Sequence, residues 1–201
     1  MLQADRIKKI NEIKGKPENQ KSSKKLTYKT DRAADYPVFE IPLDSIIFNS
    51  LNGRIGSFRN AYEKQYGADT LNAELPEHEA KIIEAIWNQR KNDNENTKKS
   101  IQTEGQIEPG VITADGIIID GNRRAMCLKK IDPRGYFLAA ILPDKLADER
   151  NEIRRLETQL QMGRDAIVDY DTTAKYLRAK EFKDEDGESL EQIAIHFREL
   201  T

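Results

Sequence analysis

The four residues Gly121-Asn122-Arg123-Arg124 have the types and the spacing to bind an anion. They follow an apolar run and begin a segment whose apolar residues recur at helical spacing. A glycine lets the backbone approach an anion closely, the first turn of a helix offers unpaired N–H groups, and guanidinium groups bind phosphate oxygens in pairs. The stretch therefore suits a polyphosphate. An arginine pair at a helix start is also commonly a solvated feature, so this stretch alone leaves both interpretations open.

A second loop, Gly105-Gln106-Ile107-Glu108-Pro109, is called the 105–109 loop hereafter. Gly105 follows a helical segment, where a glycine after the last turn accepts a positive φ. After the loop, two β-branched runs at residues 111–113 and 117–119 flank Asp115-Gly116, which is a strong hairpin signal. The order of parts is thus a helix, the loop, a hairpin, the Gly121 stretch and another helix.

The elements that position these parts are predicted from apolar spacing and turn residues. Further strands are expected at residues 38–43 and 136–142, and helices at 58–66, 76–96, 97–103, 123–131, 146–162, 170–182 and 189–200. The pattern indicates an α+β fold with a small mixed sheet flanked by helices, followed by a helical C-terminal segment. We divide the chain into a segment 1–35, a domain 36–143 with a helical insertion 57–96, and a helical segment 144–201.

Residues 1–35 hold ten Lys and Arg against five Asp and Glu, although the whole chain has a net charge of −2. Ile7, Ile10 and Ile13 predict a short amphipathic helix, and the polar stretch that follows favours a flexible segment. Lysines of such a segment suit non-specific contact with nucleic-acid phosphates. The lysines concerned are Lys8, Lys9, Lys24 and Lys25.

The cellular compartment is inferred from cysteine usage and hydropathy. A single cysteine, Cys127, in 201 residues excludes an internal disulfide, and no Cys/His cluster has the spacing of a zinc site. The chain has no run of about 18 apolar residues, and its N-terminus has no apolar secretion signal. We therefore expect a cytoplasmic protein without a membrane span.

The arrangement of these motifs resembles the ParB family. Its members have a helix, a Gly-x-x-x-Pro step, a β-hairpin and a Gly-Glu-Arg-Arg box that opens a helix. The 105–109 loop looks like the first box and Gly121-Asn122-Arg123-Arg124 like the second. Asn52-Gly53-Arg54 lies where the family has an Asn-Pro-x-x-Arg entry loop, and residues 156–161 lie where it has a Glu-Asn-x-Gln-Arg box. The resemblance covers residues 38–201 except the helical segment 57–96.

The resemblance implies a ParB/sulfiredoxin fold and a switch domain of a DNA-associated protein that can form a homodimer. It implies binding of a nucleoside triphosphate, CTP or ATP, with Mg²⁺. Arg123 and Arg124 would hold phosphates, and Gly121 would allow their close approach. The nucleotide-binding residues implied are Gly105, Gln106, Pro109, Gly121, Asn122, Arg123, Arg124 and Gln161. The last two helices resemble the start of a helix-turn-helix, whose reader helix is not among residues 1–201.

Two departures from the family pattern concern catalysis. Asn122 stands in place of the family's glutamate, and Thr158 in place of an asparagine in the later box. The candidate catalytic residues are Asp120 and Glu157, and Glu157 is also the candidate metal ligand. We therefore expect nucleotide binding and leave open whether the chain is a CTPase or an ATPase.

Two enzyme classes of the same fold are the alternatives. Sulfiredoxin needs a reactive cysteine in a Gly-Cys-His-Arg box. Here Asn122 and Arg123 occupy the positions of the cysteine and the histidine of that box. Cys127 lies among apolar residues typical of a core. Relatives that hydrolyse nucleotides, nick DNA in defence systems or phosphorylate small substrates carry an Asp-Gly-x-x-Arg box. Asp120-Gly121-Asn122-Arg123-Arg124 fits that pattern as well.

Overall fold

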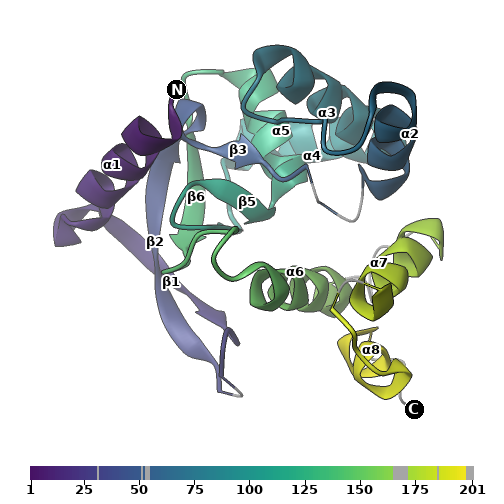
Figure 1. Ribbon diagram of the computed structural model, residues 1–201. Helices are drawn as coiled ribbons and strands as arrows, with labels where there is room; N and C mark the ends of the chain where they lie inside the picture. The colour runs from purple at the N-terminus through teal and green to yellow at the C-terminus, as the bar shows by residue number, and fades with distance from the viewer. Residues whose placement is uncertain (31, 51, 53–54, 165–171, 185, 198–201) are drawn as a thin grey trace.

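The computed structural model describes residues 1–30, 32–50, 52, 55–164, 172–184 and 186–197, without the side chains of residues 161–164, 172–175, 178 and 195–197. A six-stranded sheet runs through it in the order β1-β2-β6-β4-β5-β3 (Figure 1). Parallel and antiparallel pairs both occur in this sheet, so the predicted α+β class with a small mixed sheet is confirmed. The strands are Gln20–Leu26 (β1), Ala34–Pro42 (β2), Ile47–Phe48 (β3), Gly110–Ile112 (β4), Ile117–Asp120 (β5) and Tyr136–Ile141 (β6).

The β4–β5 hairpin places the two candidate loops side by side. Gly116 has φ +84° in the turn, which confirms the predicted Asp-Gly hairpin. The Thr113 hydroxyl donates to the Asp115 carboxylate at 2.6 Å and accepts the Ile117 N–H at 2.9 Å. Val111, the middle residue of β4, lies opposite Asp120 at the end of β5. The 105–109 loop, which precedes β4, therefore lies beside the residues that follow β5.

The sheet buries apolar side chains on both faces, because successive residues of a strand point to opposite sides. Phe137 and Ile141 of β6 pack into the larger core on one face. The Ala140 side chain points to the opposite face of the sheet and packs there with Ile153 and Leu156. In Figure 1, the helices α2 to α5 gather in the upper part of the view and α6 to α8 in the lower right.

The helices of the larger core include Gly56–Tyr66 (α2), Pro76–Gln89 (α3), Lys91–Glu104 (α4) and Asn122–Ile131 (α5). The helix predicted at residues 97–103 is wrong in its start, because α4 begins six residues earlier. The helix predicted at residues 76–96 is too long, because α3 ends at Gln89. Asn94 belongs to α4 and is buried. Its Nδ2 donates to the carbonyl oxygens of Ile86 at 3.0 Å and Trp87 at 2.8 Å. These bonds cap the end of α3 and allow α4 to follow at once.

Residues 1–35, whose composition favours a flexible segment, contain a helix and a strand. Gln3–Lys14 forms the predicted helix (α1), and β1 pairs antiparallel with β2. Ile10 is fully buried. The fully buried Arg6 donates through Nε to the Asp115 carbonyl oxygen at 2.6 Å and through Nη2 to the Glu74 carboxylate at 2.8 Å. Strand pairing uses backbone groups that every sequence has, and the polar side chains of β1 suit an edge strand.

The C-terminal segment contains Arg150–Arg164 (α6), Thr172–Asp184 (α7) and Leu190–Phe197 (α8). The predicted cap of the last helix is confirmed, since the Ser189 hydroxyl accepts the Gln192 N–H at 3.3 Å. The Gln192 side chain in turn accepts the Ser189 N–H at 2.8 Å, which completes a capping box. No helix within the described ranges is both long and apolar enough to span a bilayer.

Ion pairs join α6 to the loop between α7 and α8. Arg154 Nη1 lies 3.0 Å from the Asp186 carboxylate, and Arg155 Nη2 lies 2.6 Å from the Glu188 carboxylate. The carboxylates of Asp186 and Glu188 are each 4% exposed. The loop is therefore held by charge, and the helices on either side of it meet through the apolar contact of Phe182 with Ile193.

The burial of α1 predicts that Ile10→Ala lowers the free energy of unfolding by about 2–5 kcal/mol, because it leaves a cavity in the core. Glu12→Ala, on the exposed side of the same helix, should change it by no more than about 0.5 kcal/mol. Urea denaturation followed by circular dichroism measures both values. Equal small effects would mean that α1 does not belong to the core.

Candidate anion-binding site

The end of β5 and the start of α5 form the centre of the candidate site. Gly121 joins them with φ 99° and ψ 17°, a left-handed conformation that favours glycine. A Cβ at this position would also lie 2.8 Å from the Phe137 ring. Gly121 has no side chain with which to cap α5, so it cannot satisfy the N–H groups of the first turn. Arg123 and Arg124 belong to that turn.

Arg124 fastens the 105–109 loop to the end of β5. Its Nη2 donates to the Asp120 carboxylate at 3.0 Å, and its Nη1 donates to the Glu108 carbonyl oxygen at 2.9 Å. The Glu108 carboxylate lies 3.4 Å from the same Nη1. Because the Arg124 side chain is 16% exposed, its guanidinium group is largely covered yet reaches the surface. Arg124 therefore positions both loops, a role that the motif alone does not reveal.

Gln106 uses its side chain to extend the sheet. Its amide donates to the Leu138 carbonyl oxygen at 2.8 Å and accepts the Leu138 N–H at 2.8 Å. Ala139, the next residue of β6, pairs with Gly110 of β4. Beside Leu138, the Gln106 side-chain amide therefore takes the place that a backbone partner would have. Gly105 has φ +75° at the end of α4, as predicted. In this loop Ile107 is 74% exposed and offers an apolar contact at the surface.

Asn122 is buried and makes contacts within the fold. Its Oδ1 accepts the Asn49 N–H at 3.3 Å, and its Nδ2 donates to the Ile118 carbonyl oxygen at 3.3 Å. A glutamate carboxylate, which has no donor when ionised, could not satisfy the Ile118 carbonyl oxygen. The residue that departs from the ParB box thus serves to link the helix start to the segment after β3.

Lys24 is a residue of the site that sequence reasoning assigned only to general phosphate contact. From β1, its Nζ donates to the Pro109 carbonyl oxygen at 3.0 Å and to the Glu108 carboxylate at 3.2 Å. Its side chain is 11% exposed. No motif signals this contact, because it spans 84 residues of sequence and depends on the strand order.

The candidate acidic residues are less open than the arginines. Asp120 is 8% exposed and paired with Arg124, and Glu157 on α6 is 2% exposed. The Thr158 hydroxyl donates to the Arg154 carbonyl oxygen at 3.0 Å. The Gln161 side chain and the residues Gly53 and Arg54 lie outside the described part. Within that part, no group of three His, Cys, Asp or Glu is arranged to hold a metal ion.

Cys127 is fully buried in α5, as the core interpretation predicts. Its Sγ lies 3.7 Å from the Asn94 carbonyl oxygen. Burial raises the pKa of the Cys127 thiol to about 11, although the nearby Arg123 guanidinium acts in the opposite direction. A thiol in this state supplies little thiolate at neutral pH, which disfavours sulfiredoxin-type chemistry.

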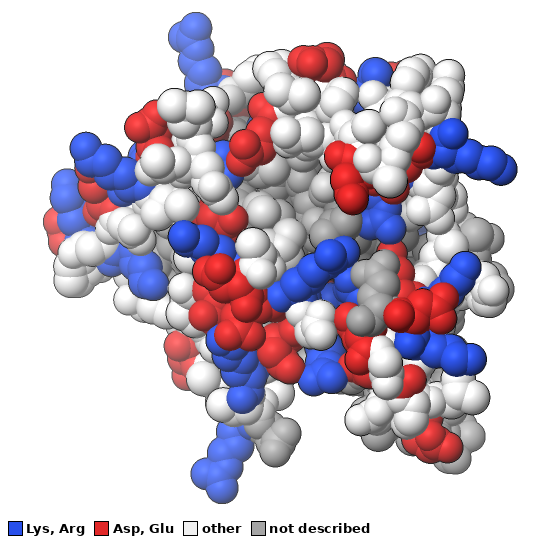
Figure 2. Space-filling view, in the orientation of Figure 1, with Lys and Arg blue, Asp and Glu red and all other residues white. Residues whose placement is uncertain are grey.

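Several lysines of the basic N-terminal segment are paired within the fold. Lys9 lies 2.9 Å from the Asp44 carboxylate, and Lys21 lies 3.2 Å from the Glu40 carboxylate. Lys29 contacts the carboxylates of both Asp144 and Glu149. Figure 2 shows the same mixture more widely, with Lys and Arg side chains interleaved with Asp and Glu over the face it draws.

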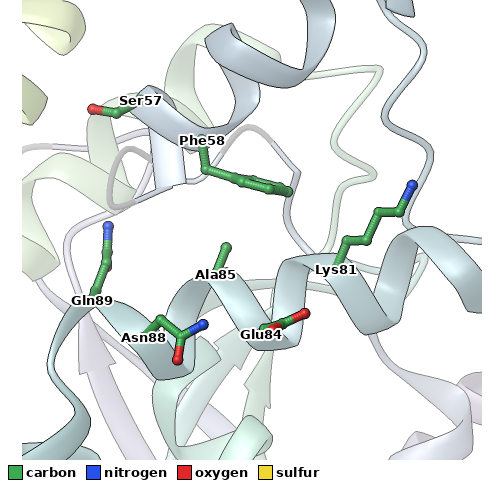
Figure 3. A pocket seen from close by; sticks show the side chains of 7 residues that line it. All are labelled: Ser57, Phe58, Lys81, Glu84, Ala85, Asn88 and Gln89. Carbon is green, nitrogen blue, oxygen red and sulfur yellow. The ribbon is translucent and has the colours of Figure 1, made fainter. Parts of the chain in front are cut away.

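A separate hollow of about 440 Å³ lies between α2 and α3. Figure 3 shows the Phe58 ring reaching from α2 towards Ala85, with polar side chains of α3 along the rim. The hollow's lining includes none of the candidate residues in the 105–109 loop or at the start of α5. The hollow is therefore distinct from the candidate site at Arg124.

The raised pKa of Cys127 predicts that thiol reagents modify this residue slowly in the folded protein. At pH 8 only about one thiol in a thousand is ionised when the pKa is near 11, and this fraction rises tenfold per pH unit up to that pKa. A thiol-specific chromogenic reagent should therefore react slowly with the folded protein and rapidly in urea. Rapid reaction of the folded protein at pH 7 would restore the sulfiredoxin-type alternative.

The side-chain pairing of Gln106 predicts that Gln106→Ala destabilises the protein by about 1–3 kcal/mol, because it leaves the backbone groups of Leu138 without their partner. Gln102→Ala is the matched control, since Gln102 is exposed on α4. Thermal and urea unfolding measure both variants. A Gln106→Ala variant as stable as the control would contradict the positioning role.

The solved structures to which this chain is similar include two of ParB proteins. No family model matches the chain, and no curated protein matches it. A structure described as the C2221 form of a Pnob8-like ParB-N domain has 13% identity and a TM-score of 0.44, over 82% of this chain and 50% of that one. A C-terminally truncated chromosome-partitioning protein ParB from Caulobacter crescentus, complexed with CTP-gamma-S, has 14% identity and a TM-score of 0.37, over 80% of this chain and 70% of that one. The chain spans about half the length of the first of these ParB structures, to which it is similar.

Proposed function

We propose that the chain binds a nucleoside triphosphate, CTP or ATP, at the start of α5 and the 105–109 loop, as the switch domain of a DNA-associated protein. The observation that carries the proposal is the contact of Arg124 with both the Glu108 carbonyl oxygen and the Asp120 carboxylate. This contact brings together the two stretches that resemble the ParB boxes, although they are separated by a hairpin in the sequence.

The chemistry of the assembled stretches supports a polyphosphate ligand. The first turn of α5 offers backbone N–H groups beside a glycine of positive φ, which is a common phosphate site. Arg123 is half-buried in that turn, and Arg124 and Lys24 add positive charge from either side of the loop. Ile107 supplies an exposed apolar side chain for the nucleoside part of the ligand.

The proposal is one of binding and not of turnover. The Asp120 carboxylate is paired with Arg124, and Glu157 is buried. Mg²⁺ commonly reaches such sites on the phosphates of its ligand and needs few protein carboxylates. We therefore propose that Mg²⁺ enters with the triphosphate, and that a CTPase, ATPase or nuclease reaction is not the main activity of these residues.

The proposed association with DNA rests on the resemblance of the last two helices to the start of a helix-turn-helix. The capping box at Ser189 fixes where α8 begins. Lys8 and Lys25 are exposed and suited to contact with phosphates. Homodimer formation belongs to the same proposal.

Isothermal titration of the chain with CTP, ATP, GTP and UTP in the presence of Mg²⁺ tests the binding. Arg123→Ala should weaken binding about 10- to 100-fold, because a charged hydrogen bond to phosphate contributes about 1.5–3 kcal/mol. Arg134→Ala, in the exposed turn after α5, is the control and should bind as the unmodified chain does.

Two results would refute the proposal: no binding of any of the four nucleotides, or unchanged affinity in Arg123→Ala. Phosphate release or plasmid nicking that disappears in Asp120→Asn would instead favour the enzyme alternatives.

A further inference from the structure

The Glu108 carboxylate lies between two cations that come from distant parts of the chain. Its Oε1 is 3.2 Å from Lys24 Nζ of β1, and its Oε2 is 3.4 Å from Arg124 Nη1 of α5. The carboxylate side chain is 53% exposed, whereas the Lys24 and Arg124 side chains are 11% and 16% exposed. The anion of this group is therefore its most accessible member.

Backbone oxygens hold both cations in place without the Glu108 side chain. Lys24 Nζ donates to the Pro109 carbonyl oxygen at 3.0 Å, and Arg124 Nη1 donates to the Glu108 carbonyl oxygen at 2.9 Å. Each nitrogen carries a further hydrogen that is suited to a second acceptor. The side chain of Glu108 can thus rotate into solvent while the two donors stay in position.

We infer that Lys24 and Arg124 form a two-cation phosphate receptor, and that the Glu108 carboxylate occupies it until a polyphosphate displaces this side chain. The inference rests on the proposed function and adds to it a residue from β1, outside the stretch that resembles ParB, and an internal competitor. The carboxylate is half exposed and both cations keep their backbone acceptors, so release of the carboxylate into solvent costs about 1 kcal/mol. A phosphate group offers more charge and more acceptor oxygens to the same two donors.

The competition predicts opposite effects of two neutral substitutions. Glu108→Gln keeps the shape of the side chain and removes its charge, so affinity for a polyphosphate should rise about fivefold. Lys24→Gln removes one receptor cation, so affinity should fall about fivefold or more. Lys21→Gln, which removes a β1 lysine paired with the exposed Glu40 carboxylate, and Glu12→Gln, exposed on α1, should leave affinity unchanged.

The experiment is isothermal titration of the full chain and these four variants with inorganic tripolyphosphate, and separately with the four nucleoside triphosphates and Mg²⁺. Thermal unfolding of each variant checks that the fold is retained. If Glu108 occupies the receptor, Glu108→Gln should bind tripolyphosphate more tightly than the unmodified chain, and Lys24→Gln should bind it more weakly. A merely structural ion pair would lower thermal stability in both variants and would not raise affinity in either.

The two proposals fail in different ways. If tripolyphosphate affinity follows the predicted order while no nucleotide binds, the receptor stands and the proposed nucleotide binding is refuted. If a nucleotide binds to the unmodified chain and Glu108→Gln and Lys24→Gln bind it and tripolyphosphate equally well, nucleotide binding stands and the receptor is overturned. If Glu108→Gln and the unmodified chain bind neither ligand, both are overturned.

Discussion

The candidate site depends on the contacts that the guanidinium group of Arg124 makes. This group reaches the Asp120 carboxylate at the end of β5 and the Glu108 carbonyl oxygen in the 105–109 loop, so one side chain sets the distance between two loops. The antiparallel pairing of β4 and β5 brings these loops near each other, and Arg124 fixes their final arrangement. A planar group with several fixed donors suits this task better than a lysine does.

Positive charge at the site is balanced by carboxylates of the same chain. Arg124 contacts Asp120, and both Arg124 and Lys24 contact Glu108. Largely covered cations of this kind need a partner, because desolvating an unpaired charge is costly. The same side chains that would attract a ligand are thus kept stable in its absence, and the exposed carboxylate is the group with the smallest cost of release.

Much of the fold could be predicted from the sequence, because apolar spacing and turn residues act locally. The Asp115-Gly116 hairpin, the helix after Gly121 and the cap at Ser189 follow from such local rules. The strand β1 and the break between α3 and α4 at Arg90 could not be predicted, since polar residues there are held by strand pairing and by the buried Asn94. The contact of Lys24 with the 105–109 loop needs the strand order, which no local pattern contains.

The position of β1 has a consequence for shortened forms of the protein. A chain that started at residue 36, the boundary suggested by composition, would lose both Lys24 and the backbone partners of β2. The uncovered side of β2 would then be open to pairing with another copy, which is a common route to aggregation. Loss of ligand binding in such a shortened chain would reflect a missing cation and self-association together, and would say little about the domain that remains.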